Sequence, residues 1–100
     1  MSDLKLSIPH NLSGEEALDR IKKLLVNLKQ DHKDLIDKAE EEWDGSTGKF
    51  RFSVKGFDLA GTMNVSSSSV DINAKLPFAV SLFKGKISQV ITDKAKELLA

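Results

Sequence analysis

The sequence predicts a single α+β domain over residues 1–100, built as two layers. An antiparallel sheet of about four to five strands forms one layer, and two helices cover one face of it. Three observations predict this architecture. Short segments alternate apolar and polar residues, which indicates strands with one buried face. Two longer segments repeat apolar residues at helical spacing. The segments follow the order β-α-β-β-β-β-α, without an internal repeat or a linker.

The first strand is expected near the N-terminus, where Leu4, Leu6 and Ile8 alternate with polar residues. Pro9 should end it, because proline cannot donate a hydrogen bond to a sheet. These apolar side chains are expected on the face that the helices cover.

A capping box at residues 13–16 predicts where the first helix begins. The Ser13 hydroxyl can accept from the Glu16 amide, while the Glu16 carboxylate can reach back to the Ser13 amide. An apolar stripe at helical spacing follows and predicts one helix over residues 14–35. Its members are Ala17, Ile21, Leu24, Leu25, Leu28, His32 and Leu35.

Residues 38–43 are ambiguous between helix and strand, because their composition favours a helix. We favour a strand, because Asp44 and Gly45 follow it and are typical of a turn. This strand would carry Ala39, Glu41 and Trp43 on one face. Glu41 would then be either a buried carboxylate or part of an edge strand.

Three further strands form an antiparallel meander with one buried face. Their inward residues are Phe50, Phe52 and Val54, then Phe57, Leu59, Gly61, Met63 and Val65, and finally Val70, Ile72, Ala74 and Leu76. The aromatic residues, Phe83 included, fall on core positions, so they do not predict a stacking platform for nucleic acid.

The last helix is expected from about residue 79. Its core stripe consists of Val80, Phe83, Ile87, Val90, Ile91, Ala95 and Leu98. Phe78, Leu82 and Gly85 lie off this stripe. A glycine in mid-helix costs about 0.8–1 kcal/mol relative to alanine, so a close approach by another surface would explain it.

These three residues, with Lys84 and Lys86 beside them, predict an apolar surface patch with a basic rim. The alternative is that Phe78 and Leu82 cover the edge of the sheet and that Gly85 is merely tolerated.

His10 and Glu41 are the candidates for a polar site. His10 follows the first strand and could act as a base or contact a ligand. The alternative is that its ring bonds a backbone group and fixes the turn into the helix. The carboxylates around Glu41 are typical of a solvated face.

Composition excludes several classes of function. The 15 basic and 15 acidic residues balance, which argues against nucleic-acid binding. Residues 45–100 are mildly basic, with 8 basic and 4 acidic residues. Two histidines and no cysteine make a metal site unexpected and exclude disulfides. No signal pattern or membrane-spanning run is present, so we expect a cytoplasmic protein.

The chain resembles the polyhydroxyalkanoic acid system proteins of bacteria, the granule-region family. The resemblance rests on Pro9-His10-Asn11-Leu12, Trp43-Asp44-Gly45, Phe50-Arg51-Phe52, Gly61-Thr62-Met63, and Leu76-Pro77-Phe78 running into Phe83-Lys84-Gly85-Lys86-Ile87. Members occur beside polyhydroxyalkanoate storage genes, and the family supplies no catalytic residues. At the level of the fold alone, the order of elements resembles a small helix-grip protein of the START-like class.

Two functions follow as expectations. The first is a non-enzymatic accessory protein without a cofactor, which contacts the polyhydroxyalkanoate granule surface or granule proteins. The second is a carrier that holds an acyl chain in a cavity between sheet and helices, lined by Phe52, Leu59, Met63, Ile72 and Phe83. The sequence leaves the partner and the oligomeric state open, a homodimer included. A catalytic role for His10 and Glu41 is the third and least favoured reading.

Overall fold

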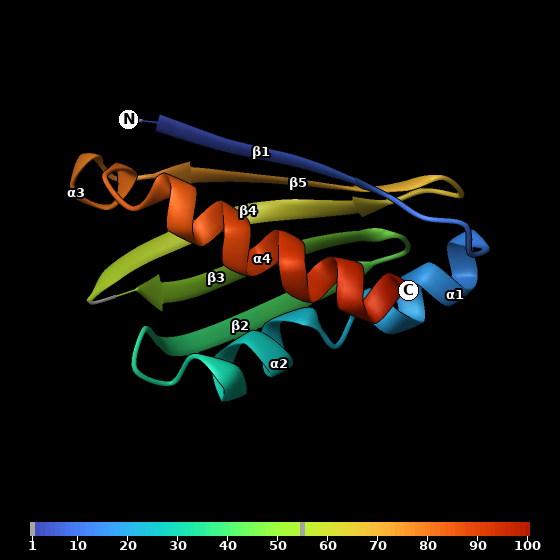
Figure 1. Ribbon diagram of the computed structural model, residues 1–100, viewed down its shortest axis with the longest axis horizontal. Coiled ribbons are helices and arrows are strands. Elements are labelled where there is room, and N and C mark those ends of the chain that lie inside the picture. Colours follow the sequence, from blue (N-terminus) through green and yellow to red (C-terminus); the bar gives the residue numbers. More distant parts are fainter. Residues whose placement is uncertain (1, 55) are drawn as a thin grey trace.

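The computed structural model describes residues 2–54 and 56–100 and contains five strands and four helices in these ranges (Figure 1). In chain order they are β1 Ser2–Pro9, α1 Gly14–Ile21, α2 Leu24–Asp31, β2 Ile36–Asp44, β3 Thr47–Val54, β4 Phe57–Val65, β5 Ser69–Leu76, α3 Phe78–Ser81 and α4 Lys84–Leu99.

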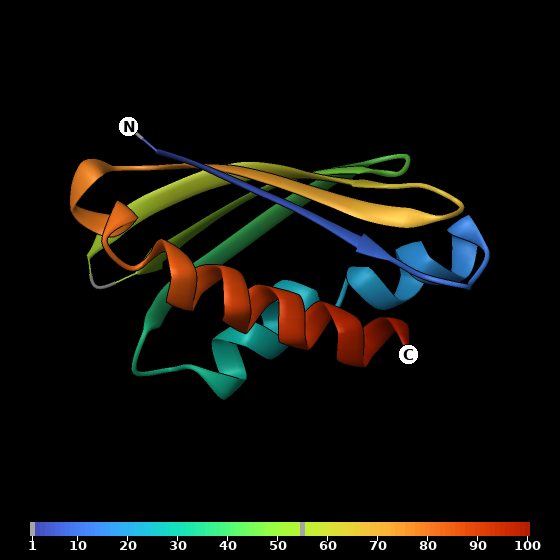
Figure 2. The ribbon, with the colours of Figure 1, turned by 45° about the horizontal axis from the view of Figure 1, so that its top comes forward.

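The strands form one antiparallel sheet in the order β1-β5-β4-β3-β2. Strands β2 to β5 are a meander, and β1 pairs with β5 at the far edge. Helices α2 and α4 lie side by side under one face, while the other face is open (Figures 1 and 2). The predicted α+β class, the two layers and the helix-grip-like arrangement of a long last helix across a sheet are therefore confirmed.

The core lies between the covered face of the sheet and the helices. The inward residues predicted for β1, β3 and β5 are all buried except Leu6, which is half-buried. The open face of the sheet is polar and is tied across strands by short hydrogen bonds. Ser7 donates to Asp71 over 2.7 Å, and Thr47 donates to Asn64 over 2.8 Å.

The region of residues 36–44 is a strand, and its predicted face is confirmed by the register. Glu41 is opposite Phe50, and Trp43 is opposite Gly48. The strand lies at an edge, which explains how a carboxylate shares a face with an indole. A register shift between Ile36 and Ala39 marks a bulge near its start.

Two glycines make room for aromatic rings on neighbouring strands. A Cβ on Gly48 would lie 2.9 Å from the Trp43 ring. A Cβ on Gly61 would lie 2.7 Å from Phe50 Cζ and 2.1 Å from the backbone oxygen of Asn73. Gly61 is therefore required by the close approach of β4 to β5, rather than by an unusual backbone angle.

The first predicted helix is wrong in its length. The chain turns tightly at residues 22–23, where the Lys23 amide donates to the Arg20 carbonyl, and the helical region ends at Asp31 instead of residue 35. The break lets α1 contact α4 and β4 while α2 runs along β2. Half of the capping box forms, since Ser13 Oγ accepts from the Glu16 amide over 3.1 Å. The Glu16 carboxylate pairs with Arg20 instead.

The last predicted helix is also interrupted, at residues 82–83, and this changes which residues are buried. Phe83 caps α4 and is 46% exposed, so its expected place in the core is wrong. Phe57, at the start of β4, is 45% exposed against the same expectation. Leu99 is buried, while Leu98 is only half-buried. Gly85 lies in the first turn of α4 and not in mid-helix.

Candidate functional site

Four large apolar side chains are exposed at one end of the molecule. Phe78 and Leu82 are each 78% exposed, and Phe57 and Phe83 are nearly half exposed. We call these four residues the apolar tip. They come from the segment that links β5 to α4 and from the start of β4, and both lie at the same end of the sheet (Figure 1). Because β4 and β5 are antiparallel and pair Ala60 with Lys75, the start of β4 and the end of β5 lie at the same end of the sheet.

The local backbone explains why the tip points outward. Leu76 ends β5, and Pro77 precedes the single-turn helix α3, so the chain leaves the sheet abruptly. The Ser81 hydroxyl donates to the Phe78 carbonyl over 2.6 Å and closes this turn. Val80 is the one residue of α3 that points into the core. Phe78 and Leu82 therefore project from a short, anchored turn.

The residues predicted for the basic rim lie beside the tip. Lys86 is exposed and Lys84 is half-buried, both in the first turn of α4. A Cβ on Gly85 would meet no atom within 4 Å, so no contact within the chain requires a glycine there. Phe78, Leu82, Gly85 and Lys86 are all exposed in this one segment, and Lys84 between them is half-buried. Sequence reasoning missed Phe57 and Phe83 as members of the tip.

His10 and Glu41 are not brought together, because they lie on the two opposite edges of the sheet. His10 Nδ1 accepts from the Leu12 amide over 3.1 Å. Its Nε2 must therefore carry the proton and donate to the Ser66 carbonyl, 2.9 Å away. Both nitrogens are engaged in joining the β1–α1 turn to the β4–β5 turn.

Glu41 faces a groove of about 510 Å³ between α2 and β2, which Lys29 and Lys33 also line. Burial raises the pKa of the Glu41 carboxyl above 4.5, and Trp43 and Lys22 oppose this rise. The Trp43 indole nitrogen is buried and makes no hydrogen bond with another described residue. Lys22 Nζ lies 5.9 Å from the centre of the Trp43 ring.

The space between sheet and helices is filled. Two cavities there measure about 10 Å³ each, and Phe52, Met63 and Ile72 are among the residues that line them. Ligand sites for small molecules usually enclose about 300–1,000 Å³. Phe83, expected to line such a cavity, is exposed instead. The acyl-carrier reading has no interior cavity of the required size here.

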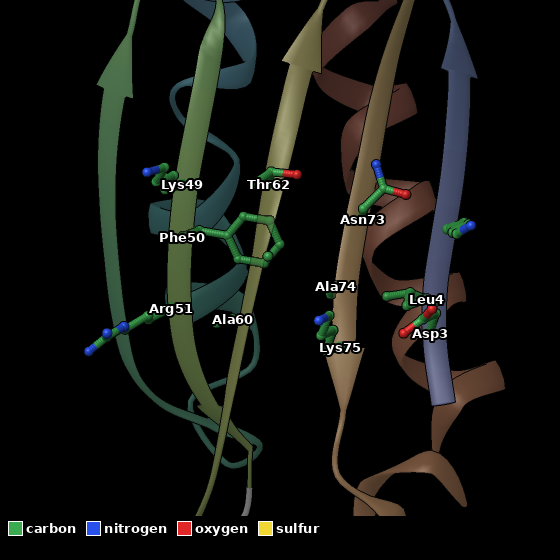
Figure 3. Close-up of a pocket in the computed structure, with 12 residues that line it drawn as sticks. Asp3, Leu4, Lys49, Phe50, Arg51, Ala60, Thr62, Asn73, Ala74 and Lys75 are labelled. Atoms are coloured by element: carbon green, nitrogen blue, oxygen red, sulfur yellow. The ribbon is translucent and has the colours of Figure 1, made fainter. Parts of the chain in front are cut away.

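A larger depression of about 470 Å³ lies on the open face of the sheet, and sequence reasoning missed it. Its floor follows residues 60–62 of β4, and basic residues from β1, β3 and β5 surround it (Figure 3). We call it the outer trough. Its basic residues are Lys5, Lys49, Arg51 and Lys75. On the same face, Glu42, Glu40 and Asp3 lie directly across the strands from Lys49, Arg51 and Lys75. Figure 3 shows Arg51 extending away from the floor toward β2.

Among the residues that the structure describes, no helix is both long enough and apolar enough to cross a membrane. Within the same residues, no three histidine or acidic side chains form a group that could hold a metal ion.

Comparison with known proteins matches a family model and several solved structures, one of which is named here. The chain is similar to the crystal structure of Ara h 8.0201, with 11% identity, a TM-score of 0.48, and coverage of 98% of this chain and 97% of that one. A search of the curated proteins found no match. Residues 4–99 match the model of the family described as Putative polyhydroxyalkanoic acid system protein. The match spans nearly the whole chain and includes all the motifs, from Pro9 to Ile87, on which the resemblance in the sequence rests. This chain therefore belongs to the polyhydroxyalkanoic acid system protein family.

Proposed function

We propose that this protein is a non-enzymatic, cytoplasmic accessory protein that associates with the surface of polyhydroxyalkanoate granules through the apolar tip. The observation that carries the proposal is the exposure of Phe78 and Leu82, each 78% accessible on one anchored corner. Family membership supplies the class of surface, because the family is named for the polyhydroxyalkanoic acid system.

Burying these two side chains would contribute enough free energy to hold the protein on an apolar surface. Full burial of a leucine or phenylalanine side chain contributes about 1.5–3 kcal/mol. Scaled by the exposure of Phe78 and Leu82, the pair would contribute about 2–5 kcal/mol at an apolar surface. That corresponds to roughly 30-fold or more in partition. Lys84 and Lys86 would stay at the water boundary beside the tip, as amphipathic side chains do.

The remaining candidates support a binding role over a catalytic one. Both ring nitrogens of His10 are used by backbone groups, and Glu41 lies at the opposite edge of the sheet. A catalytic site needs groups that converge on one substrate position. The tip supplies apolar area without such convergence, which suits adhesion to a surface.

Co-sedimentation with polyhydroxyalkanoate granules tests the proposal. The Phe78→Ser, Leu82→Ser variant should lose at least about 30-fold in bound fraction relative to free protein. Val26→Ser is the matched control, because Val26 is 53% exposed on α2 and lies outside the tip. The control should bind as the wild type does, and circular dichroism should show that all three proteins are folded.

Two outcomes would contradict the proposal. Equal granule binding by the tip variant and the wild type would remove the tip from the interaction. The second outcome is that neither protein binds granules, the wild type is a stable dimer in solution, and the tip variant has the mass of a monomer. This result would assign the tip to contact with a second copy of the chain.

A further inference from the structure

The segment that presents the apolar tip carries charge of one sign. Residues 72–92, which contain Phe78, Leu82 and Phe83, include three lysines and no acidic residue. At 15 acidic residues in 100, a stretch of this length would hold about three if they were evenly spread. The tip is therefore joined to a cationic segment in a chain whose net charge is zero.

Two of these lysines, Lys84 and Lys86, have no carboxylate partner. Neither side chain forms an ion pair or a hydrogen bond with another described residue. The next acidic residue on α4 is Asp93, which follows Lys86 by seven residues and lies about 10 Å farther along the helix axis. Both lysines lie in the first turn of α4, directly after the segment that carries Phe78 and Leu82. Their charges are thus available to an external anion.

Other acidic residues at this end of the molecule belong to the sheet and its connections, namely Asp3, Asp34, Asp37 and Asp58. Asp3 is directly opposite Lys75, and Asp58 accepts a hydrogen bond from the Ser53 hydroxyl over 2.7 Å. Asp34 and Asp37 lie by the start of β2, at the edge of the sheet opposite β1. Lys84 and Lys86 lie on α4 instead, under the covered face of the sheet (Figure 2).

The backbone of the tip suits contact with a surface that excludes water. The Pro77 carbonyl accepts from the amides of Val80 and Ser81, each over 3.0 Å. The Ser81 hydroxyl also donates to the Phe78 carbonyl, and the Phe83 amide donates to the Val80 carbonyl over 2.8 Å. Carbonyls without partners would cost free energy when the tip leaves water. The turn can therefore approach an apolar phase with these carbonyls satisfied.

Apolar side chains on a short turn, with lysines directly behind them, are typical of attachment to an anionic lipid surface. The apolar groups reach the acyl chains, and the cations stay at the level of the headgroups. A neutral polymer would accept Phe78 and Leu82 but would leave the lysines without a partner. A protein would have to supply a pocket for each projecting side chain together with matching carboxylates, whereas a lipid surface accepts both without matching shape.

We propose that the apolar tip binds a surface of anionic phospholipid. Phe78 and Leu82 enter the acyl chains, and Lys84 and Lys86 contact the phosphate groups. This inference rests on the proposed function, because it assigns anionic phospholipid to the granule surface that the tip contacts. The attraction of two lysines should tighten binding about 30-fold over a neutral lipid surface, and added salt should screen it.

Co-sedimentation with sucrose-loaded vesicles tests the proposal. At low salt, the wild type should bind about 30-fold more tightly to phosphatidylcholine vesicles that contain phosphatidylglycerol than to pure phosphatidylcholine vesicles. The difference should nearly vanish at about 1 M salt, where the Debye length is about 3 Å. The Lys84→Gln, Lys86→Gln variant should lose most of the difference at low salt. The Phe78→Ser, Leu82→Ser variant should bind both kinds of vesicle weakly.

The matched control is Lys23→Gln, Lys96→Gln, which removes two exposed charges away from the tip and has the same net charge as the first variant. It should bind as the wild type does. Equal affinity of the wild type for neutral and anionic vesicles would overturn the lipid assignment. An equal loss in the control would also overturn it, because the effect would then follow net charge alone.

Granule co-sedimentation separates this inference from the proposed function. If the wild type binds granules through the tip but shows no preference for anionic vesicles, the lipid assignment is rejected and the tip remains the granule contact. The polymer itself or an acidic protein would then be what the tip meets. If the wild type binds anionic vesicles but not granules, the proposed function is rejected and the tip remains a lipid-binding surface.

Discussion

Replacement of Gly61 by alanine should destabilise the sheet strongly. The added Cβ would lie 2.1 Å from the Asn73 carbonyl oxygen and 2.9 Å from Ala74 Cα, both backbone atoms of β5. A carbon and a carbonyl oxygen rarely approach closer than about 3.3 Å, so β4 and β5 must separate by roughly 1 Å. Overpacking typically costs about 1–3 kcal/mol, and a weakened ladder hydrogen bond adds about 1 kcal/mol. We expect a loss of about 2–4 kcal/mol.

Urea unfolding followed by circular dichroism measures this loss, and thermal unfolding should show a fall in Tm of roughly 10–25 °C. Gly85→Ala is the matched control. Its Cβ meets open space in the first turn of α4, so it should be neutral or stabilise by up to about 1 kcal/mol. Adding Phe50→Leu to Gly61→Ala should restore little of the lost stability, because it relieves only the contact between the new Cβ and the Phe50 ring and leaves the contacts with the β5 backbone. A Gly61→Ala protein within about 0.5 kcal/mol of the wild type would refute the reasoning from backbone contact.

Three further changes test single contacts. Ser13→Ala removes the hydroxyl that accepts from the Glu16 amide and should cost about 1 kcal/mol in urea unfolding; an unchanged midpoint would show that the cap is not stabilising. Burial raises the pKa of Glu41, so the folded state holds the proton more tightly and loses stability as the pH rises through that pKa. Glu41→Gln should therefore be more stable than the wild type at pH 7, with the difference vanishing below pH 4.5, and a constant difference would argue against this linkage. The hydrogen bond from Lys94 holds the pKa of Asp31 below 3.8, so its stabilisation is present at pH 7 and is lost in acid. Asp31→Asn should be less stable than the wild type at pH 7 and should converge with it below pH 3.8; parallel pH curves would contradict this.

The sheet was predictable because its signal is local. Strict alternation in residues 50–54 and 70–76 marks the buried face directly. A glutamate on the same face as Trp43 left two alternatives, a buried carboxylate or an edge strand, and the register shows the edge strand. Both helix breaks escaped prediction because neither residues 22–23 nor residues 82–83 contain glycine or proline. A stripe counted through the second break placed Phe83 in the core, although the change of direction there turns it outward.

The two surface sites also differ in how local their sequence signal is. Phe78 and Leu82 were predictable, because they lie off a stripe within one segment. Phe57 joins them only through the pairing of β4 with β5. The outer trough depends on strand order, since Lys5, Lys49 and Lys75 are distant in the sequence and meet only in the folded sheet. The one available signal was a lysine at an outward position in several strands.

The place of β1 at the far edge of the sheet has a consequence for biosynthesis. This strand leaves the ribosome first, yet its partner is β5, so Ile8 must wait for Val70 before it can pair. Closing such a long loop is slow, and Leu4 and Ile8 stay exposed to other nascent chains in the interval. The meander of β2 to β5 can form beforehand, because each of its strands pairs with the next one synthesised. The N-terminal strand should therefore be the last to gain protection when folding is followed by pulsed hydrogen exchange.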